Sequence, residues 1–331
     1  MAKRIVYGPL LSRRLGRSLG VDAIKTADTK KNCNYDCVYC QLGHVPKKIT
    51  GTDEPEGIVT PDEIVEGIRT YHKNIENLDY ITFSGTCEPT LNPLLGEMIR
   101  KVKEISTHPV CVITNSSLLG NREVRENLAD ADLLVATLVS GYEKTFQAIN
   151  RPAEGIRLED IINGLKEIRR MDKHPKLGIE VMLVDVSEDT NIDFPVNHTE
   201  KEIGKLKEVL KEIDPDEIEI LSVSRPPAEK YIVPVPEERL RKIALEFEKE
   251  FGEERVKLVL KGLRRSRSVM KHGNLEEEVY DLILRRPCTF KQISASLGID
   301  EGKLKPIIEK LASADSIKEI DIKEQKYYKA S

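Results

Sequence analysis

Three cysteines lie within eight residues near the N-terminus, and they are the residues of this sequence best suited to chemistry. Cys33, Cys37 and Cys40 are separated by three and then two residues, whereas the other three of the six cysteines are scattered. A structural zinc site normally has four protein ligands, and His44 is the only close candidate for a fourth. Three cysteines instead suit a cubane iron–sulfur cluster with one iron left open for a substrate or cofactor. Zinc binding and plain burial of the thiols are the two alternatives.

The elements that must position these cysteines alternate regularly through residues 57–260. Short apolar runs of strand character alternate with amphipathic segments of helical spacing. This alternation predicts βαβ units and a parallel sheet covered by helices, with ligands at the carboxyl ends of the strands. About six such units fit an incomplete barrel or a doubly wound sheet. The expected strands are 78–83, 110–114, 133–138, 177–184, 217–223 and 256–260, and the expected helices are 91–105, 122–128, 143–149, 158–170, 200–213 and 237–251.

The cysteine run, with Tyr39 directly before its last member, resembles the signature of the radical S-adenosylmethionine (radical SAM) superfamily. The resemblance implies a partial (β/α)6-type TIM barrel over residues 1–260, with a cluster loop at 25–45. It also implies a [4Fe–4S] cluster on the three cysteines, whose open iron is chelated by S-adenosylmethionine. One-electron reduction would then give a 5′-deoxyadenosyl radical. In that superfamily the aromatic residue lies near the adenine, and we assign this role to Tyr39, with loop packing as the alternative.

A polar motif after the first expected strand extends the resemblance. The segment 84–91 reads Ser-Gly-Thr-Cys-Glu-Pro-Thr-Leu and is similar to the Gly-Gly-Glu-type motif of the superfamily. Gly85 permits close approach of the backbone, and the resemblance implies that Glu88 holds the methionyl ammonium of the cofactor. Cys87 stands where a glycine is usual, and we interpret it as a small apolar filler.

Two further candidates for cofactor binding follow from later strands. Asn115, in Thr-Asn-Ser-Ser at the end of the 110–114 strand, resembles a polar strand terminus of the superfamily. A turn-capping role is the alternative for this asparagine. Glu180 lies inside an apolar strand, where an unpaired carboxylate would be expensive, and relatives place a polar cofactor contact on that strand. The residues that act on the substrate are not identifiable.

Two flanking segments, 7–22 and 225–229, narrow the resemblance to a short prokaryotic subgroup related to the tRNA wyosine-synthesis radical enzymes. Their arginines are candidates for bidentate contacts to an anionic substrate, with a structural role as the alternative; they are Arg13, Arg14, Arg17 and Arg225. The wyosine reaction itself does not carry over, because those enzymes have an additional cysteine set and no cysteine precedes Cys33.

The C-terminal part has a different pattern. Residues 261–273 are basic and contain no acid, which predicts a linker. Residues 274–331 then predict three helices and two strands in a winged-helix-like module, with Thr289 and Asp300 as N-caps of the second and third helices. This module has ten Lys and Arg against eleven Asp and Glu, so it carries no basic footprint. Nucleic-acid contact and protein docking or packing both stay open. The expected helices are 275–284, 290–297 and 303–312, and the expected strands are 317–322 and 326–329.

Composition restricts the number of domains and the class of protein. The chain has 331 residues, a net charge of −4, 39% hydrophobic and 33% charged residues. Such a chain folds as about two domains and is neither a disordered tail nor a broadly basic nucleic-acid coat. The sequence contains neither a secretion signal nor an apolar stretch of membrane-spanning length, so we expect a cytoplasmic location.

These observations favour an enzyme that cleaves S-adenosylmethionine reductively and abstracts hydrogen from a substrate. Electrons would come from a flavodoxin-like or ferredoxin-like donor. RNA or protein, bound through the C-terminal module, and a small molecule are the open substrate classes. The alternative is a metal or redox sensor in which the cysteines control a DNA-binding module. That hypothesis leaves the βαβ array and the Glu-Pro-Thr-Leu motif without a role.

Overall fold

The computed structural model describes residues 4–25, 31–50, 55–72, 78–260, 274–322 and 325–331. The predicted basic linker, 261–273, and residues 26–30 of the predicted cluster loop therefore lie outside the described residues. Within these ranges, no helix combines the length and the apolar character needed to cross a membrane.

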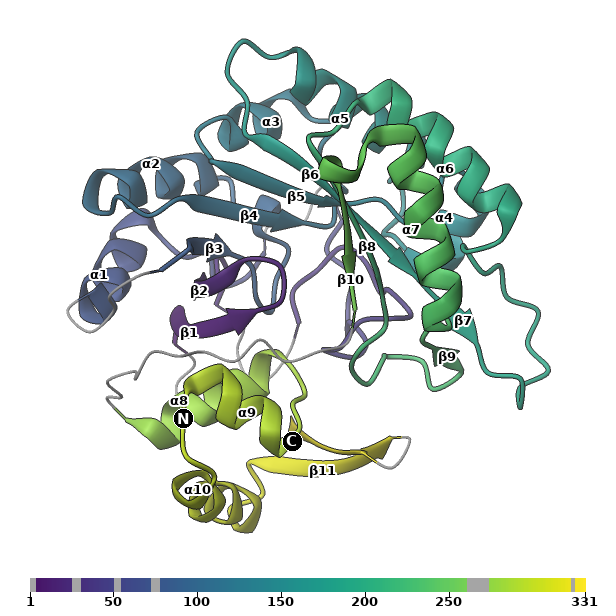
Figure 1. Ribbon diagram of the computed structural model, residues 1–331. Helices are drawn as coiled ribbons and strands as arrows, with labels where there is room; N and C mark the ends of the chain where they lie inside the picture. Colours follow the sequence, from purple (N-terminus) through teal and green to yellow (C-terminus); the bar gives the residue numbers. More distant parts are fainter. Residues whose placement is uncertain (1–3, 26–30, 51–54, 73–77, 261–273, 323–324) are drawn as a thin grey trace.

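One curled eight-stranded sheet is the frame of the molecule (Figure 1), in the order β1-β2-β3-β4-β5-β6-β8-β10. Neighbouring strands from β2 to β10 are parallel, and only β1 pairs antiparallel, with β2. The strands are β1 (Val6–Ser12), β2 (Gly16–Val21), β3 (Tyr80–Phe83), β4 (Val110–Thr114), β5 (Leu133–Thr137), β6 (Lys176–Leu183), β8 (Glu217–Ser222) and β10 (Val256–Val259). The sheet forms an open half-barrel, which confirms the predicted partial barrel.

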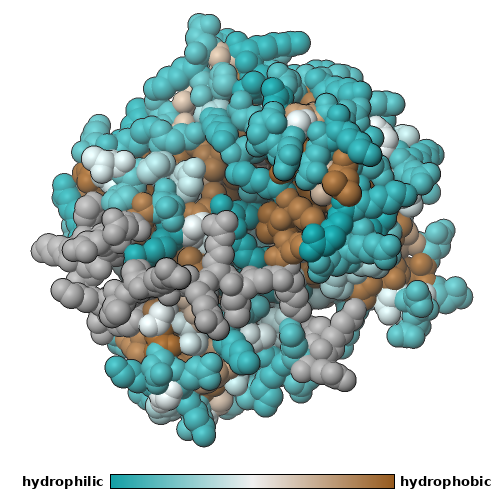
Figure 2. Space-filling model, viewed as in Figure 1, coloured by the Kyte–Doolittle hydropathy of each residue, from teal (hydrophilic) through white to brown (hydrophobic). Residues whose placement is uncertain are grey.

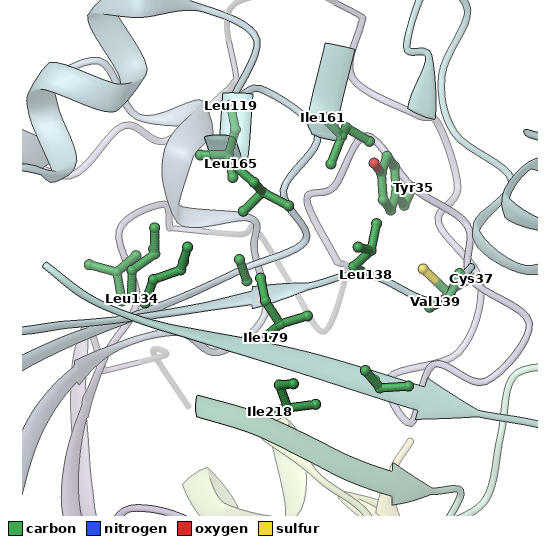
Figure 3. Packing of buried hydrophobic residues seen from close by; sticks show 14 of the residues in the cluster. Tyr35, Cys37, Leu119, Leu134, Leu138, Val139, Ile161, Leu165, Ile179 and Ile218 are labelled. Atoms are coloured by element: carbon green, nitrogen blue, oxygen red, sulfur yellow. The ribbon is translucent and has the colours of Figure 1, made fainter. Parts of the chain in front are cut away.

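The connecting helices lie along the convex side of this sheet (Figure 1). They are α1 (Pro61–His72), α2 (Leu95–Ile105), α3 (Arg122–Leu128), α4 (Glu143–Asn150), α5 (Leu158–Arg170), α6 (Glu200–Ile213) and α7 (Glu237–Phe251). Helix α2 shows why: Leu95, Met98, Ile99 and Val102 recur at helical spacing and are all buried. The strands supply matching apolar residues, and Figure 3 shows Leu134, Ile179 and Ile218 in the resulting core.

The N-terminal hairpin of β1 and β2 is the main element that the sequence prediction missed. Its residues are rich in glycine and arginine and contain Pro9, so they lack the apolar run of a buried strand. Pro9 is tolerated because β1 is an edge strand. The hairpin extends the parallel sheet by two strands, so the half-barrel has eight strands instead of the six expected.

Smaller differences occur at element ends and between β6 and α7. The predicted helix 91–105 is divided into a 3₁₀ turn at Pro89–Leu91 and α2, with residues 92–94 between them. A two-stranded ribbon of β7 (Asp185–Val186) and β9 (Ile232–Val233) was not predicted. A 3₁₀ turn at Glu253–Arg255 precedes β10.

The C-terminal unit contains the elements that the sequence predicts. These are α8 (Leu275–Arg285), α9 (Phe290–Leu297), α10 (Glu301–Ser313), β11 (Ile317–Ile322) and β12 (Gln325–Ala330). Thr289 caps α9 through a capping box with Gln292, and the Asp300 side chain accepts from the amide of Gly302, so both predicted N-caps are confirmed. The unit has its own apolar core, which includes the fully buried Cys288.

This C-terminal unit packs against the N-terminal hairpin. Helices α8 and α9 contact β1, and Leu10 of that strand packs into the core of the unit. Figure 1 shows the unit below the hairpin, on the open side of the half-barrel. The surface in Figure 2 is largely hydrophilic, with hydrophobic residues visible mainly near β8 and β10 and over the C-terminal unit.

Candidate functional site

A cavity of about 780 Å³ lies between the half-barrel and the C-terminal unit. Its volume falls in the range of small-molecule sites, roughly 300–1,000 Å³. All eight residues that the sequence singles out for cluster and cofactor binding line it, and they are Cys33, Cys37, Tyr39, Cys40, Gly85, Glu88, Asn115 and Glu180. The C-terminal unit contributes further lining residues, namely Arg285, Arg286, Thr289, Lys291, Gln292, Ala295, Ser296 and Gln325.

The cysteine loop is tied to the end of α4 by backbone hydrogen bonds. The Asp36 amide donates to Arg151 O (3.2 Å), and the Val38 amide donates to Ile149 O (2.9 Å). Tyr35 is buried and meets Phe146 of α4 edge-on, with ring centroids 5.8 Å apart. Figure 3 shows Tyr35 and Cys37 beside the residues that follow β5. The loop is therefore held at the carboxyl end of the sheet, where the sequence predicts ligand binding.

Two asparagine side chains donate to cysteine sulfur atoms. Asn115 Nδ2 lies 3.4 Å from Cys33 Sγ, and Asn150 Nδ2 lies 3.3 Å from Cys37 Sγ. The Tyr35 amide also donates to Cys33 Sγ at 3.4 Å. N–H donors stabilise the thiolate over the thiol and tune the potential of a cluster that the sulfur atoms hold.

Lys31 adds a buried positive charge beside the three thiols. Burial opposes its charge, but the proximity of Cys40, Cys33 and Cys37 outweighs burial and raises the pKa of the ammonium. Its Nζ is buried and has no oxygen or nitrogen partner among the described residues. An isolated buried cation is costly unless an anion accompanies it. The residues therefore fit a cluster held by thiolates, which would bring negative charge to this place.

Burial favours the protonated form of two of the three thiols. Burial raises the pKa of Cys33 to about 12 and that of Cys37 to about 11. A metal centre would have to displace these protons, because the thiolate is the ligand. Across the described ranges, no three Cys, His, Asp or Glu side chains are arranged as ligands of a single metal ion.

Glu88 is buried and joins two segments of the site. Its Oε1 accepts from the Thr90 amide (3.1 Å), the Thr90 hydroxyl (2.7 Å) and the Thr114 hydroxyl (2.7 Å), and its Oε2 accepts from the Asn115 amide (2.7 Å). Burial raises the pKa of the carboxyl, and these donors oppose that rise. Each carboxylate oxygen has about two acceptor positions, and Oε2 has a single donor among the described residues, so it keeps one position for a further donor.

Glu180, the predicted cofactor contact on β6, has a partner inside the protein. It pairs with Arg14, which also lies 2.9 Å from Glu219 Oε2. Thr137 Oγ1 donates weakly to Glu180 Oε1 at 3.4 Å. Arg14 is thus neutralised inside the half-barrel, so its proposed contact with an anionic substrate is not supported. These partners were not predictable, because strand register places Glu180 beside Glu219 and the β1–β2 turn brings Arg14 to both.

Tyr39 is half-buried, and the burial of its phenol raises the pKa of that group. Its hydroxyl accepts from Asn150 Nδ2 at 3.1 Å, the same group that donates to Cys37. The tyrosine is therefore held in place beside the thiols, and its side chain lines the cavity.

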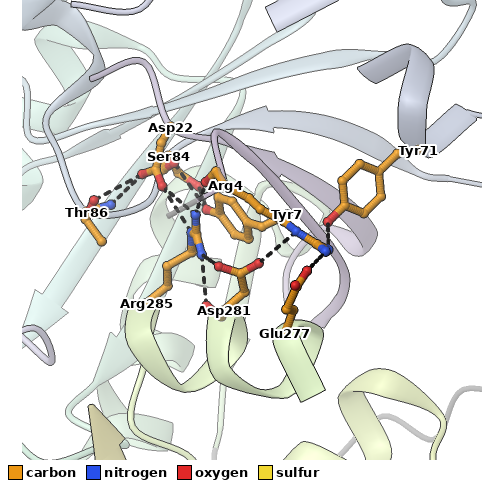
Figure 4. Close-up of polar contacts among 9 residues, drawn as sticks. All are labelled: Arg4, Tyr7, Asp22, Tyr71, Ser84, Thr86, Glu277, Asp281 and Arg285. Atoms are coloured by element: carbon orange, nitrogen blue, oxygen red, sulfur yellow. Dashed lines mark hydrogen bonds and ion pairs between the residues drawn. The ribbon is translucent and has the colours of Figure 1, made fainter. Parts of the chain in front are cut away.

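A buried network connects the Gly85 motif to the C-terminal unit (Figure 4). Asp22 Oδ1 accepts from the Thr86 amide at 2.8 Å, and Asp22 Oδ2 accepts from Arg285 Nε at 3.0 Å. Arg285 also pairs with Asp281 and lies 3.7 Å from the centroid of the Tyr7 ring. Asp22 thus links the C-terminal unit to the loop that the sequence assigns to cofactor binding.

Gly85 has a φ of +137°, and a Cβ there would overlap the Asp22 carboxylate. We expect Gly85→Ala to lower the free energy of unfolding by about 1–3 kcal/mol, from strained backbone and displaced Asp22. Gly204→Ala, within α6 and with open space around it, is the control and should raise stability by up to about 1 kcal/mol. Chemical denaturation measures both, and equal shifts in the same direction would contradict the prediction.

Comparison with known proteins agrees with this geometry. The model of the radical SAM superfamily matches residues 29–194. UPF0026 protein MJ1312 of Methanocaldococcus jannaschii is 32% identical over 314 residues, with 91% of this chain and 92% of that protein covered. The chain belongs to the radical SAM superfamily and is an enzyme of that family.

Two further similarities cover only part of the related protein or concern only the fold. A Brachyspira hyodysenteriae protein named GTPase Obg is 31% identical over 314 residues, covering 95% of this chain but 43% of that protein. This chain thus spans less than half the length of that relative. The crystal structure of Streptococcus suis SuiB bound to S-adenosylmethionine has a TM-score of 0.50 at 16% identity, covering 71% of this chain and 49% of that chain. This likeness concerns the fold.

Several residues of the site escaped the sequence analysis. Lys31 had a weak signal, since it lies two positions before the first cysteine. Asn150 had none, because more than a hundred residues separate it from Cys37. Arg285 and Arg286 were assigned to the C-terminal module with no indication that they reach the cavity.

Proposed function

We propose that this enzyme binds a [4Fe–4S] cluster on Cys33, Cys37 and Cys40 together with S-adenosylmethionine, and abstracts hydrogen from a substrate held in the same cavity. When bound, the cluster and the cofactor supply reductive cleavage of the sulfonium and a 5′-deoxyadenosyl radical. The observation that carries the proposal is the convergence of the three thiols and all five candidate cofactor residues on one cavity.

The residues of the chain would hold and orient these groups. Glu88 Oε2 has an acceptor position left and is suited to the methionyl ammonium, while Asn115 and Asn150 donate to the sulfur atoms. Tyr39 would face the adenine, and Gly85 would let the backbone approach the cofactor. Glu180 is paired with Arg14, so its part would be to fix the wall of the cavity or to share a hydrogen bond with the ribose.

The finer assignments concern the C-terminal unit and the substrate. We propose division into a barrel (1–260), a linker (261–273) and a winged-helix-like module (274–331), in a subgroup related to the wyosine-synthesis enzymes. Residues of α9 line the cavity. This favours a module that contacts the substrate, and it argues against a separate DNA-binding module. RNA, protein and small-molecule substrates all fit this arrangement, with a flavodoxin-like or ferredoxin-like protein as electron donor.

The test is anaerobic. The protein is reconstituted with iron and sulfide, reduced with dithionite and incubated with S-adenosylmethionine, and 5′-deoxyadenosine is quantified. We expect product, and a change in the EPR spectrum of the reduced cluster on addition of the cofactor. A sensor has no reason to bind the cofactor at its iron, so an intact cluster with neither product nor spectral change would overturn the proposal.

Glu88→Gln should weaken cofactor binding specifically. The amide loses the negative charge that faces the ammonium, and hydrogen bonds to charged groups contribute about 1.5–3 kcal/mol, so Kd for S-adenosylmethionine should rise about 10- to 100-fold. Glu97→Gln, on the exposed face of α2, is the matched control and should bind as the wild type does. Calorimetry on the reconstituted proteins measures Kd, and an unchanged value for Glu88→Gln would remove this residue from the cofactor site.

A further inference from the structure

Three arginines from distant parts of the chain meet at the cavity, and none of them forms an ion pair with a carboxylate of the described residues. Arg13 comes from the turn after β1, Arg225 follows β8, and Arg286 follows α8, and all three line the cavity. Burial and the charges of Arg14 and Arg286 lower the pKa of Arg13. Burial and the charge of Arg286 lower the pKa of Arg225 to about 10, with a further contribution from Arg13. The three side chains are therefore close enough to repel one another.

The hydrogen-bond partners that these arginines have in the described part of the chain are neutral. Arg13 donates to Leu260 O (3.0 Å) and Ser224 Oγ (2.7 Å). Arg225 Nη1 donates to Gln41 Oε1 at 3.3 Å, and Arg286 Nη2 donates to Ser296 Oγ at 2.9 Å. The neighbouring arginines differ: Arg14 and Arg285 are both neutralised by buried carboxylates.

Two of the three guanidinium groups also keep an unused donor. The Nε atoms of Arg225 and Arg286 are buried and have no hydrogen-bond partner in the part of the chain that the structure describes. A buried, unsatisfied donor on a charged group costs several times what an exposed one does. A negatively charged ligand would offset the repulsion among the three guanidinium groups and would accept from the unused donors.

The three arginines lie close to the cysteine loop. Gln41, which accepts from Arg225, directly follows Cys40 in the sequence. Lys291 of α9 lines the cavity as well and adds a fourth positive charge. An anion bound by these residues would therefore lie beside the cysteine loop, with the half-barrel on one side and the C-terminal unit on the other.

We propose that Arg13, Arg225 and Arg286 form a subsite for a phosphate monoester, and that the substrate carries this group. The inference rests on the proposed radical SAM function and gives that substrate its chemical class. A monoester dianion has three terminal oxygens for several N–H donors, and arginine matches phosphate through paired hydrogen bonds. A carboxylate or a phosphodiester of a nucleic-acid backbone has one negative charge and would leave more of the positive charge unbalanced.

Anaerobic calorimetry on the reconstituted holoenzyme with S-adenosylmethionine tests the subsite, with methyl phosphate as the monoester probe. Dimethyl phosphate and acetate are the diester and carboxylate probes, at pH 8, where the monoester is a dianion because its second pKa is about 6. We expect methyl phosphate to bind at least about tenfold more tightly than either, since it carries twice the charge.

Substitutions assign the binding to the arginines. Arg286→Gln and Arg225→Lys should each raise Kd for methyl phosphate about tenfold or more, the first by removing charge and the second by removing the planar donor pair. Arg122→Gln is the matched control, because Arg122 on α3 is 84% exposed and pairs with Glu126 on the same helix, and it should bind as the wild type does. Removing one of three repelling charges should leave folding intact.

The outcomes separate this inference from the proposed function, because 5′-deoxyadenosine is measured on the same samples. Methyl phosphate binding that depends on Arg286, with an intact cluster but neither 5′-deoxyadenosine nor the EPR change, would support the anion subsite and overturn the radical function. Product without methyl phosphate binding would overturn the subsite alone. Equal affinity for dimethyl phosphate would also overturn it, as would wild-type affinity in both arginine variants.

Discussion

Cys37→Ala is expected to abolish the formation of 5′-deoxyadenosine and to reduce the iron and sulfide content of the reconstituted protein to a small fraction of the wild-type content. The proposed cluster has three protein ligands, and removal of one leaves two thiolates to hold it. Cys37 also receives the hydrogen bond from Asn150, so its loss disturbs the fixed position of Tyr39. Product formation and metal analysis on the same anaerobic samples measure both effects.

Cys111→Ala is the matched control for this prediction. Cys111 is a fully buried thiol on β4, and it is absent from the lining of the cavity. Its replacement should lower the free energy of unfolding by about 1 kcal/mol, as buried substitutions commonly do, and leave metal content and product unchanged. Wild-type activity in Cys37→Ala, or a loss of activity in both variants, would contradict a cluster on the 33–40 loop.

Arg285→Met is expected to lower the free energy of unfolding by about 3–5 kcal/mol, because it leaves buried acids without their counter-charge. The side chain is almost fully buried, with 2% exposed, and its guanidinium lies 2.9 Å from Asp22 and 3.0 Å from Asp281. Burial already raises the pKa of Asp281, so its charge depends on this pairing. Methionine fills much of the volume of the arginine side chain, so the loss of stability reflects the missing charge more than altered packing.

The measurement is chemical denaturation followed by a probe in each unit, because the barrel and the C-terminal unit need not unfold together. Adding Asp22→Asn to Arg285→Met should recover part of the loss, since it removes one of the stranded charges. Arg241→Met, on the exposed face of α7 and paired with Glu237, should change stability by less than about 1 kcal/mol. A similar small change for Arg285→Met would show that the network in Figure 4 contributes little.

The sequence predicted well what depends on short stretches of chain. The cysteine spacing, the Gly85 to Glu88 motif and the alternation of strands and helices are local patterns, and they lead to the half-barrel and to the end of it that carries the site. The caps at Thr289 and Asp300 are equally local, since each depends on residues within one helical turn.

The prediction failed where local pattern and tertiary role diverge. The β1–β2 hairpin has no apolar run, because its strands are stabilised by a partner strand on one side and by the C-terminal unit on the other. Arg14 was a candidate for substrate binding, but Glu180 neutralises it. The two residues are 166 positions apart, so no local pattern indicates the pairing. The sequence alone does not indicate which of several arginines forms an ion pair with an aspartate or glutamate in the folded protein.

The class of chemistry is therefore encoded locally, because neighbouring residues of one loop fix the spacing of the ligands. The distribution of charges depends on tertiary packing. Asp22 and Arg285 are 263 positions apart, and they meet only because α8 packs on the N-terminal hairpin. The same packing brings Arg286 to Arg13 and Arg225, and no described carboxylate pairs with any of the three. Long-range charge pairing follows from strand register and from the docking of whole units, and neither is written in a local pattern.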